Sequence, residues 1–100
     1  MTARARRNFL PIIAMPKLSE FYGIQIFIYG REHGVPLLHA KYQGGEIVIA
    51  IGTFAVLEGG ISGRAVGLVM EWAAMRNDEL LSAWNALQSG NSPRKIEPLK

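Results

Sequence analysis

The sequence predicts an α+β fold in two layers, with a three- to four-stranded antiparallel meander packed on a C-terminal α-helix. Three observations indicate this class: apolar residues alternate between residues 21 and 58, glycine pairs interrupt that alternation, and apolar residues recur every three or four positions over residues 65–87. A chain of 100 residues with 49% hydrophobic content has enough apolar surface for one core, so we expect a single domain.

The first strand is expected over residues 21–29, because isoleucines at every second position, Ile24, Ile26 and Ile28, would share one face of it. A loop follows to Pro36, and residues 37–43 predict the second strand. The Gly44-Gly45 pair favours a tight hairpin turn, since glycine adopts positive φ without a steric penalty.

Two further strands follow that turn. Residues 46–51 form the third strand and residues 53–58 a short fourth one. The Gly59-Gly60 pair is expected to end the sheet.

A helical pattern begins after Ser62, which is suited to cap a helix N-terminus. The apolar stripe is formed by residues spaced three and four apart: Ala65, Leu68, Val69, Trp72, Ala73, Leu80, Ala83 and Leu87. Residues 76–78 interrupt this stripe, so one bent helix and two separate helices both fit the pattern. Gly90 is expected to close the helix.

The domain is expected to span residues 15–90, between two extensions. Residues 1–14 contain the charge run "RARR" and no apolar periodicity, and "MPKLSEFYGI" from Met15 resembles a natural chain start. We interpret residues 1–14 as a translation start placed too early or a disordered basic tail. The alternative is an arm that contacts nucleic acid or a partner. Residues 91–100, with two prolines, are expected to form a C-terminal tail.

Composition excludes several classes of function. The chain has no cysteine, which rules out disulfides, thiolate catalysis and cysteine-based zinc sites and favours a cytoplasmic protein. No apolar run reaches the roughly 20 residues that span a bilayer, so no membrane association is expected. Arg4, Arg6 and Arg7 account for the net charge of +3, so the remainder of the chain is neutral and lacks a predicted nucleic-acid face.

Both histidines lie in one predicted hairpin region, with His33 in the loop and His39 on the second strand. Strand alternation places His39 and Lys41 on one side, and we expect Arg64, at the helix start, to lie within reach of them. Three interpretations remain open. His33 and His39 could transfer protons in metal-independent RNA cleavage, with Lys41 or Arg64 stabilising the phosphate. They could ligate a metal ion with Glu32 or Glu46. In the third interpretation, which we favour, His39 is a sheet residue hydrogen-bonded to a neighbour and His33 is a solvated loop residue. No metal or cofactor is predicted.

Two other residues have alternative roles. Arg64 is unfavourably placed for the helix dipole and is expected to pair with Glu46 or Glu58, the alternative being a phosphate contact. Trp72 and Trp84 are most simply core residues. Trp84, at the edge of the apolar stripe, could instead line a partner groove.

Five stretches together resemble the DUF4160 family of small prokaryotic domains of unknown function: "MPKLSEFYGIQIFIY", "EHGVPLLHAKY", "GGEIVIAI", "VLEGGISGRAVGLVMEW" and "ELLSAW". The resemblance runs from Met15 to about Leu99. The family hairpin typically reads Asp-His-x-Pro-Pro-His-x-His, and Glu32, His33, Pro36 and His39 match it. The sequence departs from that motif at two positions, Val35 and Leu37, and the second replaces the middle histidine. Outside the hairpin, four residues also match: Glu46, Arg64, Glu71 and Trp72.

The resemblance implies no established activity. It implies that the gene stands beside that of another small uncharacterised protein, in pairs that look like toxin–antitoxin modules. We therefore predict a bacterial protein-binding component, with Glu32, Lys41, Glu46 and Trp84 as candidate contacts. The alternative is a ribonuclease-type toxin that uses His33, His39 and Arg64. A homodimer through a sheet edge or the Trp84 region is a third possibility.

Overall fold

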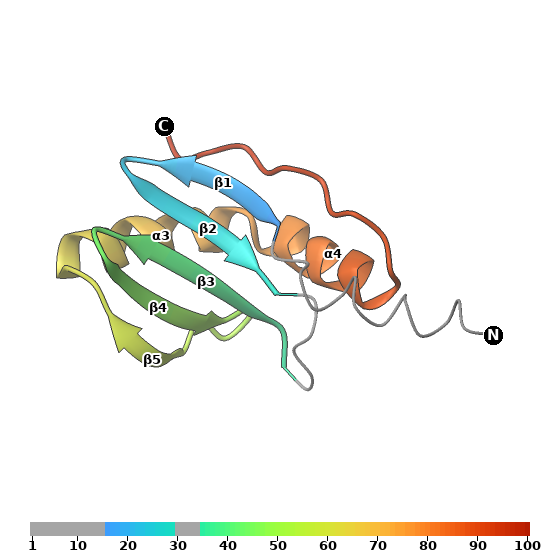
Figure 1. Ribbon diagram of the computed structural model, residues 1–100, viewed down its shortest axis with the longest axis horizontal. Coiled ribbons are helices and arrows are strands. Elements are labelled where there is room, and N and C mark those ends of the chain that lie inside the picture. The colour runs from blue at the N-terminus through green and yellow to red at the C-terminus, as the bar shows by residue number, and fades with distance from the viewer. Residues whose placement is uncertain (1–15, 30–34) are drawn as a thin grey trace.

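The structure, a computed structural model, describes residues 16–29 and 35–100; the extension predicted at residues 1–14 lies outside them. Within these ranges it contains one antiparallel sheet of five strands, in the order β1-β2-β3-β4-β5, and two helices that cover one face of the sheet (Figure 1). The elements are β1 (Lys17–Phe21), β2 (Ile24–Ile28), β3 (Leu37–Tyr42), β4 (Gly45–Ala50), β5 (Val56–Gly60), α3 (Gly63–Met75) and α4 (Asn77–Gln88). The predicted two-layer α+β architecture with an antiparallel meander is confirmed.

The predicted number of strands, three to four, is wrong because the chain forms a hairpin at the start of the first predicted strand. Tyr22 and Gly23 have φ values of 52° and 81°, and Phe21 pairs with Ile24 across them. Two consecutive positive φ values define the type I′ turn, whose twist matches that of the flanking strands. Tyr22 is an aromatic residue typical of strands, so the alternation pattern continued through the turn without marking it.

The β3–β4 turn lies one residue earlier than predicted. Gln43 and Gly44 occupy it, with φ values of 48° and 83°, and Tyr42 pairs with Gly45. Gly45 is therefore the first residue of β4. A Cβ atom there would lie 2.7 Å from the backbone oxygen of Gly60, so Gly45 allows the close approach of β5.

The fourth predicted strand is also displaced, because β5 begins at Val56 and includes the glycines that were expected to end the sheet. Gly59 pairs with Ile47, and Gly60 pairs with Glu46. The register shifts at Leu57, which has no partner on β4 and forms a β-bulge. All five residues of β5 are exposed.

The helical region is divided at Arg76, whose φ and ψ of −114° and 21° leave the helical range. The structure thus contains two helices, the second of the arrangements that the sequence left open. The predicted cap at Ser62 is confirmed, because its Oγ accepts a hydrogen bond from the N–H of Ala65 at 3.2 Å.

The core lies between the inner face of the sheet and the helices. Trp72 is fully buried, and its ring lies 5.2 Å from that of Phe21 at an angle of 40°. The largest of the other buried side chains come from both layers: Leu18, Ile24, Ile26, Ile28, Leu38, Ile47, Ile49, Val69 and Leu80. Because the helices use one face of the sheet, side chains that alternate with these isoleucines point the other way.

The C-terminal segment, residues 91–100, has no helix or strand but runs along β1 (Figure 1). The N–H of Ile96 donates to the backbone oxygen of Leu18 at 2.8 Å, and Ile96 and Leu99 are buried in the core cluster. Pro93 and Pro98 have no N–H to donate, which limits strand pairing here. This segment, expected to be a tail, is therefore packed against the core.

Gly59→Ala should destabilise the protein by about 2–4 kcal/mol, because φ is +87° and the new Cβ would collide with the backbone oxygen of Glu46. Gly44→Ala is the matched control. Gly44 has φ +83° with no atom within 4 Å of the added Cβ, so only the backbone cost of about 1 kcal/mol applies. Urea unfolding measures both, and equal losses would contradict the close approach at Gly59.

Candidate functional site

The candidate site lies on the face of the sheet that points away from α3 and α4, which we call the outer face. Strand register forms rows across it: Phe27, His39, Val48 and Glu58 are partners in one row. Gln25, Lys41 and Glu46 are partners in the next. No described helix covers this face (Figure 1).

His39 is held in the outer face by two neighbours. Its Nδ1 lies 2.8 Å from Oε2 of Glu46, and its ring stacks on that of Tyr29 with centroids 3.9 Å apart and an interplanar angle of 8°. A carboxylate only accepts hydrogen bonds, so Nδ1 carries the proton of this pair. Only 7% of His39 is exposed. The ring is thus fixed in one orientation by the Glu46 carboxylate and the Tyr29 ring.

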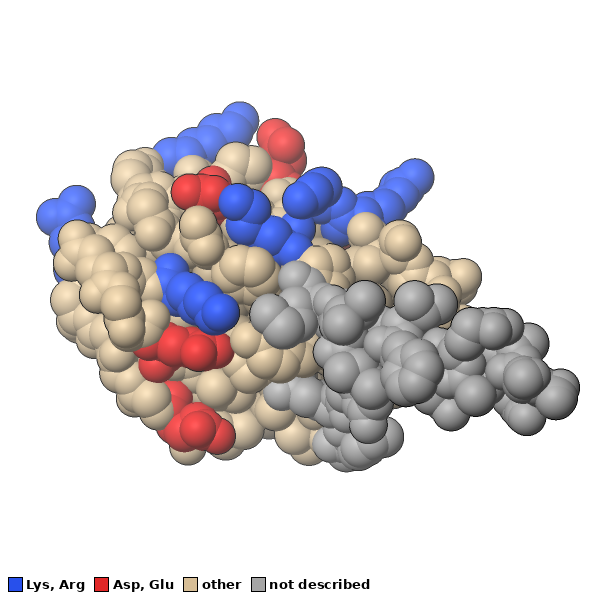
Figure 2. Space-filling model, in the orientation of Figure 1, with Lys and Arg blue, Asp and Glu red and all other residues tan. Residues whose placement is uncertain are grey.

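Lys41 continues the same face beyond His39. Its Nζ lies 5.1 Å from the ring centroid of Phe27, which is within the range of a cation–π contact worth about 0.5–1 kcal/mol at an exposed site. Glu46 stands opposite it on β4. Basic and acidic side chains therefore lie among uncharged ones on this side of the molecule (Figure 2).

A polar hollow of about 410 Å³ adjoins Lys41 and Glu46 at the end of the sheet where two hairpin turns meet. The β1–β2 and β3–β4 turns are neighbours because β2 begins beside the end of β3, with Gln25 paired to Lys41. The lining comes from the two turns and the strands beside them: Gly23, Gln25, Lys41, Tyr42, Gln43, Gly44, Gly45 and Glu46. The hollow offers an ammonium, a carboxylate and two amides to a polar ligand group.

Arg64 is not part of this arrangement. It lies on the first turn of α3, the helix that packs on the opposite face of the sheet, and its side chain is exposed. It forms no hydrogen bond or ion pair with residues 16–29 or 35–100, so the predicted pair with Glu46 or Glu58 is not formed. The strand alternation of His39 and Lys41 was predicted correctly; the position of the helix start relative to them was not.

The other predicted site residues fall elsewhere. Glu32 and His33 lie in residues 30–34, outside the described part, and their roles stay predictions. Trp84 lies on α4, partly buried against the core cluster and away from the outer face. The described residues contain no group of three His, Cys, Asp or Glu side chains that could hold a metal ion. No described helix is long and apolar enough to cross a membrane.

Phe27 and Tyr29 are the site residues that the sequence analysis missed. The alternation over residues 21–29 already places them opposite the isoleucines. Their contacts with Lys41 and His39 depend on the pairing of β2 with β3. Alternation within one strand does not show which side chains on the next strand are adjacent.

Tyr29→Leu should lower the free energy of unfolding by about 0.5–1.5 kcal/mol, because the planar stack on His39 is lost. Tyr29→Phe keeps the ring and should remain within about 0.5 kcal/mol of the original protein. Tyr22→Leu is the control, since Tyr22 is 58% exposed in a turn. Urea unfolding distinguishes these variants, and an equal loss from Tyr29→Phe and Tyr29→Leu would show that the hydroxyl, not the stack, matters.

Comparison with known protein families identifies the family of this chain. The model of a domain of unknown function, DUF4160, matches residues 23–85, which include all of the outer-face residues described above. No curated protein and no solved structure matches the chain. Since the family model covers more than half of the sequence, the chain belongs to the DUF4160 family.

Proposed function

We propose that this protein works by binding another protein, as one member of a bacterial, cytoplasmic two-gene module of the toxin–antitoxin kind. The partner is the small protein encoded by the adjacent gene, as the family resemblance implies. The observation that carries the proposal is the outer face, where aromatic and charged side chains are held in fixed positions on a rigid sheet.

The composition of the outer face supports a protein partner. Phe27 and Tyr29 are half-buried, so a partner can cover the rest of their rings. Aromatic residues are enriched at the centre of protein interfaces, and charged residues are typical of the rim. Lys41 and Glu46 supply that charge beside the aromatic pair, which permits a complementary acidic and basic pair on the partner.

The rigidity of this surface also favours binding. His39 is fixed by Glu46 and Tyr29, and Lys41 rests over Phe27, so these side chains lose little freedom when a partner docks. The adjoining hollow can receive a polar group from the partner, such as a main-chain amide or a short side chain.

A second candidate, metal-independent RNA cleavage, is favoured by the same His39–Glu46 pair. The Glu46 carboxylate orients the imidazole as a candidate base for a 2′-hydroxyl. The 2′-oxygen would then attack the adjacent phosphorus as the 5′-oxygen leaves and takes a proton from water. Lys41, on the same face, takes the charge-stabilising role in place of Arg64.

Phe27→Ala should weaken the complex with the adjacent gene's product at least about tenfold, because an aromatic contact at the centre of the interface is lost. Lys41→Glu should weaken it further and change its salt dependence. Met75→Ala is the matched control, since Met75 is 60% exposed on the helical side. Co-purification and titration calorimetry measure the complex. Binding unchanged in both outer-face variants would exclude this surface.

His39→Ala tests the second candidate. If the protein cleaves RNA, this change should lower the cleavage rate of a fluorescent oligoribonucleotide in EDTA by about 10²–10⁴-fold and abolish growth arrest on induction. Arg64→Ala should leave the rate unchanged, because Arg64 lies in the other layer. If a folded His39→Ala variant still cleaves RNA or still arrests growth, the proposed ribonuclease mechanism through His39 is wrong.

A further inference from the structure

The C-terminal segment occupies a groove between β1 and the helices. Ile96 and Leu99, spaced three residues apart, are the side chains that enter the core, and they are 4% and 9% exposed. The backbone oxygen of Glu97, which lies between them, accepts a hydrogen bond from Nε1 of Trp72 at 2.7 Å. The groove thus holds the extended segment through two of the segment's aliphatic side chains and one of its backbone carbonyls.

The segment is attached on its β1 side by two polar contacts. The N–H of Ile96 donates to the backbone oxygen of Leu18, and Nζ of Lys95 donates to that of Lys17, both at 2.8 Å. A hollow of about 290 Å³ remains between β1 and residues 95–98. Ser19 lines it and is 7% exposed, and its Oγ has no hydrogen-bond partner in the described chain. The segment therefore lies in its groove without filling it.

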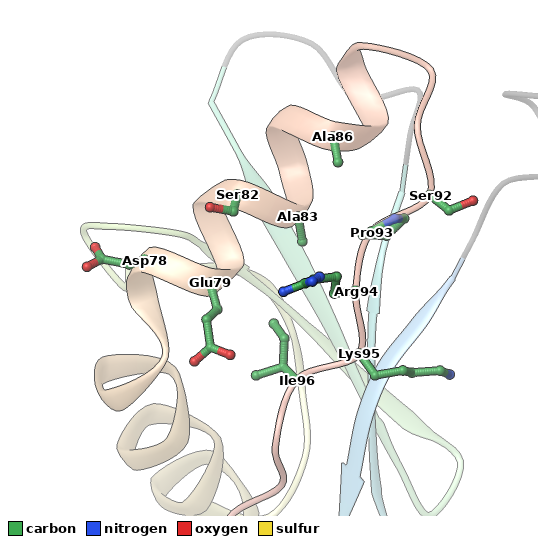
Figure 3. Close-up of a pocket in the computed structure, with 10 residues that line it drawn as sticks. All are labelled: Asp78, Glu79, Ser82, Ala83, Ala86, Ser92, Pro93, Arg94, Lys95 and Ile96. Carbon is green, nitrogen blue, oxygen red and sulfur yellow. The ribbon is translucent and has the colours of Figure 1, made fainter.

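A second hollow, of about 400 Å³, separates the segment from α4 (Figure 3). Asp78 and Glu79 stand on the α4 side, and Arg94 reaches into the space from the segment (Figure 3). The acidic first turn of α4 thus attracts the basic part of the segment across a gap. Among the described residues no ion pair joins Arg94 to these carboxylates, and Oε1 of Glu79 instead accepts from Nη1 of Arg76 at 3.2 Å.

The connection between α4 and the segment is a turn at one glycine. Gly90 has φ +82°, and the N–H groups of Gly90 and Asn91 donate to the backbone oxygens of Leu87 and Ala86 at 3.0 and 2.8 Å. This is a Schellman-type end, which needs a left-handed residue and reverses the chain toward β1. A change at Gly90 alone would redirect the segment away from its own groove.

We propose that this groove also accepts the C-terminal segment of a second copy of the chain, so that two copies exchange residues 92–99 and form a dimer. The second copy is the favoured occupant because its segment carries the same chemistry as the one already seated. Ile96, Leu99 and the oxygen of Glu97 would make the same contacts, and only the hinge at Gly90 would change. This surface is separate from the outer face and independent of the proposed function.

Amine cross-linking of the full chain tests the exchange. Lys17 and Lys95 are neighbours, because Nζ of Lys95 bonds to the backbone of Lys17. Unlabelled and ¹⁵N-labelled protein are unfolded together, refolded at high concentration and cross-linked. Exchange predicts Lys17–Lys95 cross-links that join one light and one heavy copy in the dimer fraction. If every such cross-link stays within one copy, or no dimer forms, the proposal is wrong.

Gly90→Ala should raise the dimerisation constant by about tenfold or more, because two strained hinges are relieved in each exchanged dimer. Gly44→Ala is the matched control: Gly44 has nearly the same φ, +83°, and equally open surroundings, but lies far from the hinge in sequence. Ile96→Ala should leave the constant unchanged in either background, because two monomers and one exchanged dimer lose the same two contacts. Light scattering measures the constants, and urea unfolding checks that each variant folds. An equal rise with Gly44→Ala would overturn the hinge mechanism.

Discussion

Trp72 is the residue on which the assembly of this small domain depends. Its ring packs against Phe21 at the end of β1, and its indole N–H donates to the backbone oxygen of Glu97. One fully buried side chain thus joins a helix, an edge strand and the C-terminal segment. The hydrogen bond matters as much as the packing, because a buried indole N–H without a partner would cost about 1–3 kcal/mol.

The sheet that Trp72 supports has two different edges. The β1 edge is covered by the C-terminal segment, which contributes two aliphatic side chains to the core. The β5 edge is exposed along its whole length, and it carries a bulge at Leu57 and a glycine at positive φ. Bulges and twisted edges hinder pairing with other chains. The two edges of the sheet are therefore protected in different ways, one by the C-terminal segment and the other by its own irregular backbone.

The outer face follows from the same sheet. The helices pack on the face that carries the isoleucines. Because side chains alternate along a strand, the aromatic and charged residues point to the opposite side. The Gln43-Gly44 turn fixes the β3–β4 register, which brings His39 to Glu46. The β2–β3 register brings Tyr29 to His39 and Phe27 to Lys41. A shift of one residue would exchange the two faces. The candidate site thus follows from the register of three neighbouring strands.

Much of this protein could be predicted from its sequence alone. The alternation of apolar residues predicted β2, β3 and β4 and which of their side chains share a face, and the three- and four-residue spacing predicted the helical region. Local patterns of this kind arise from the backbone geometry of a single element. They can therefore be recognised in the sequence of that element alone. His39 and Lys41 on one side of the sheet followed from that geometry.

The tertiary structure decided the remainder. Tyr22 and Gln43 adopt positive φ because the strands on both sides of them pair, which no local pattern of these residues indicates. Arg64 lies in the helical layer, and residues 94–99 pack along β1, because helix direction and chain reversal at Gly90 depend on the whole core. Contacts between elements far apart in the sequence are set by the shared core. The periodicity within one element does not predict them.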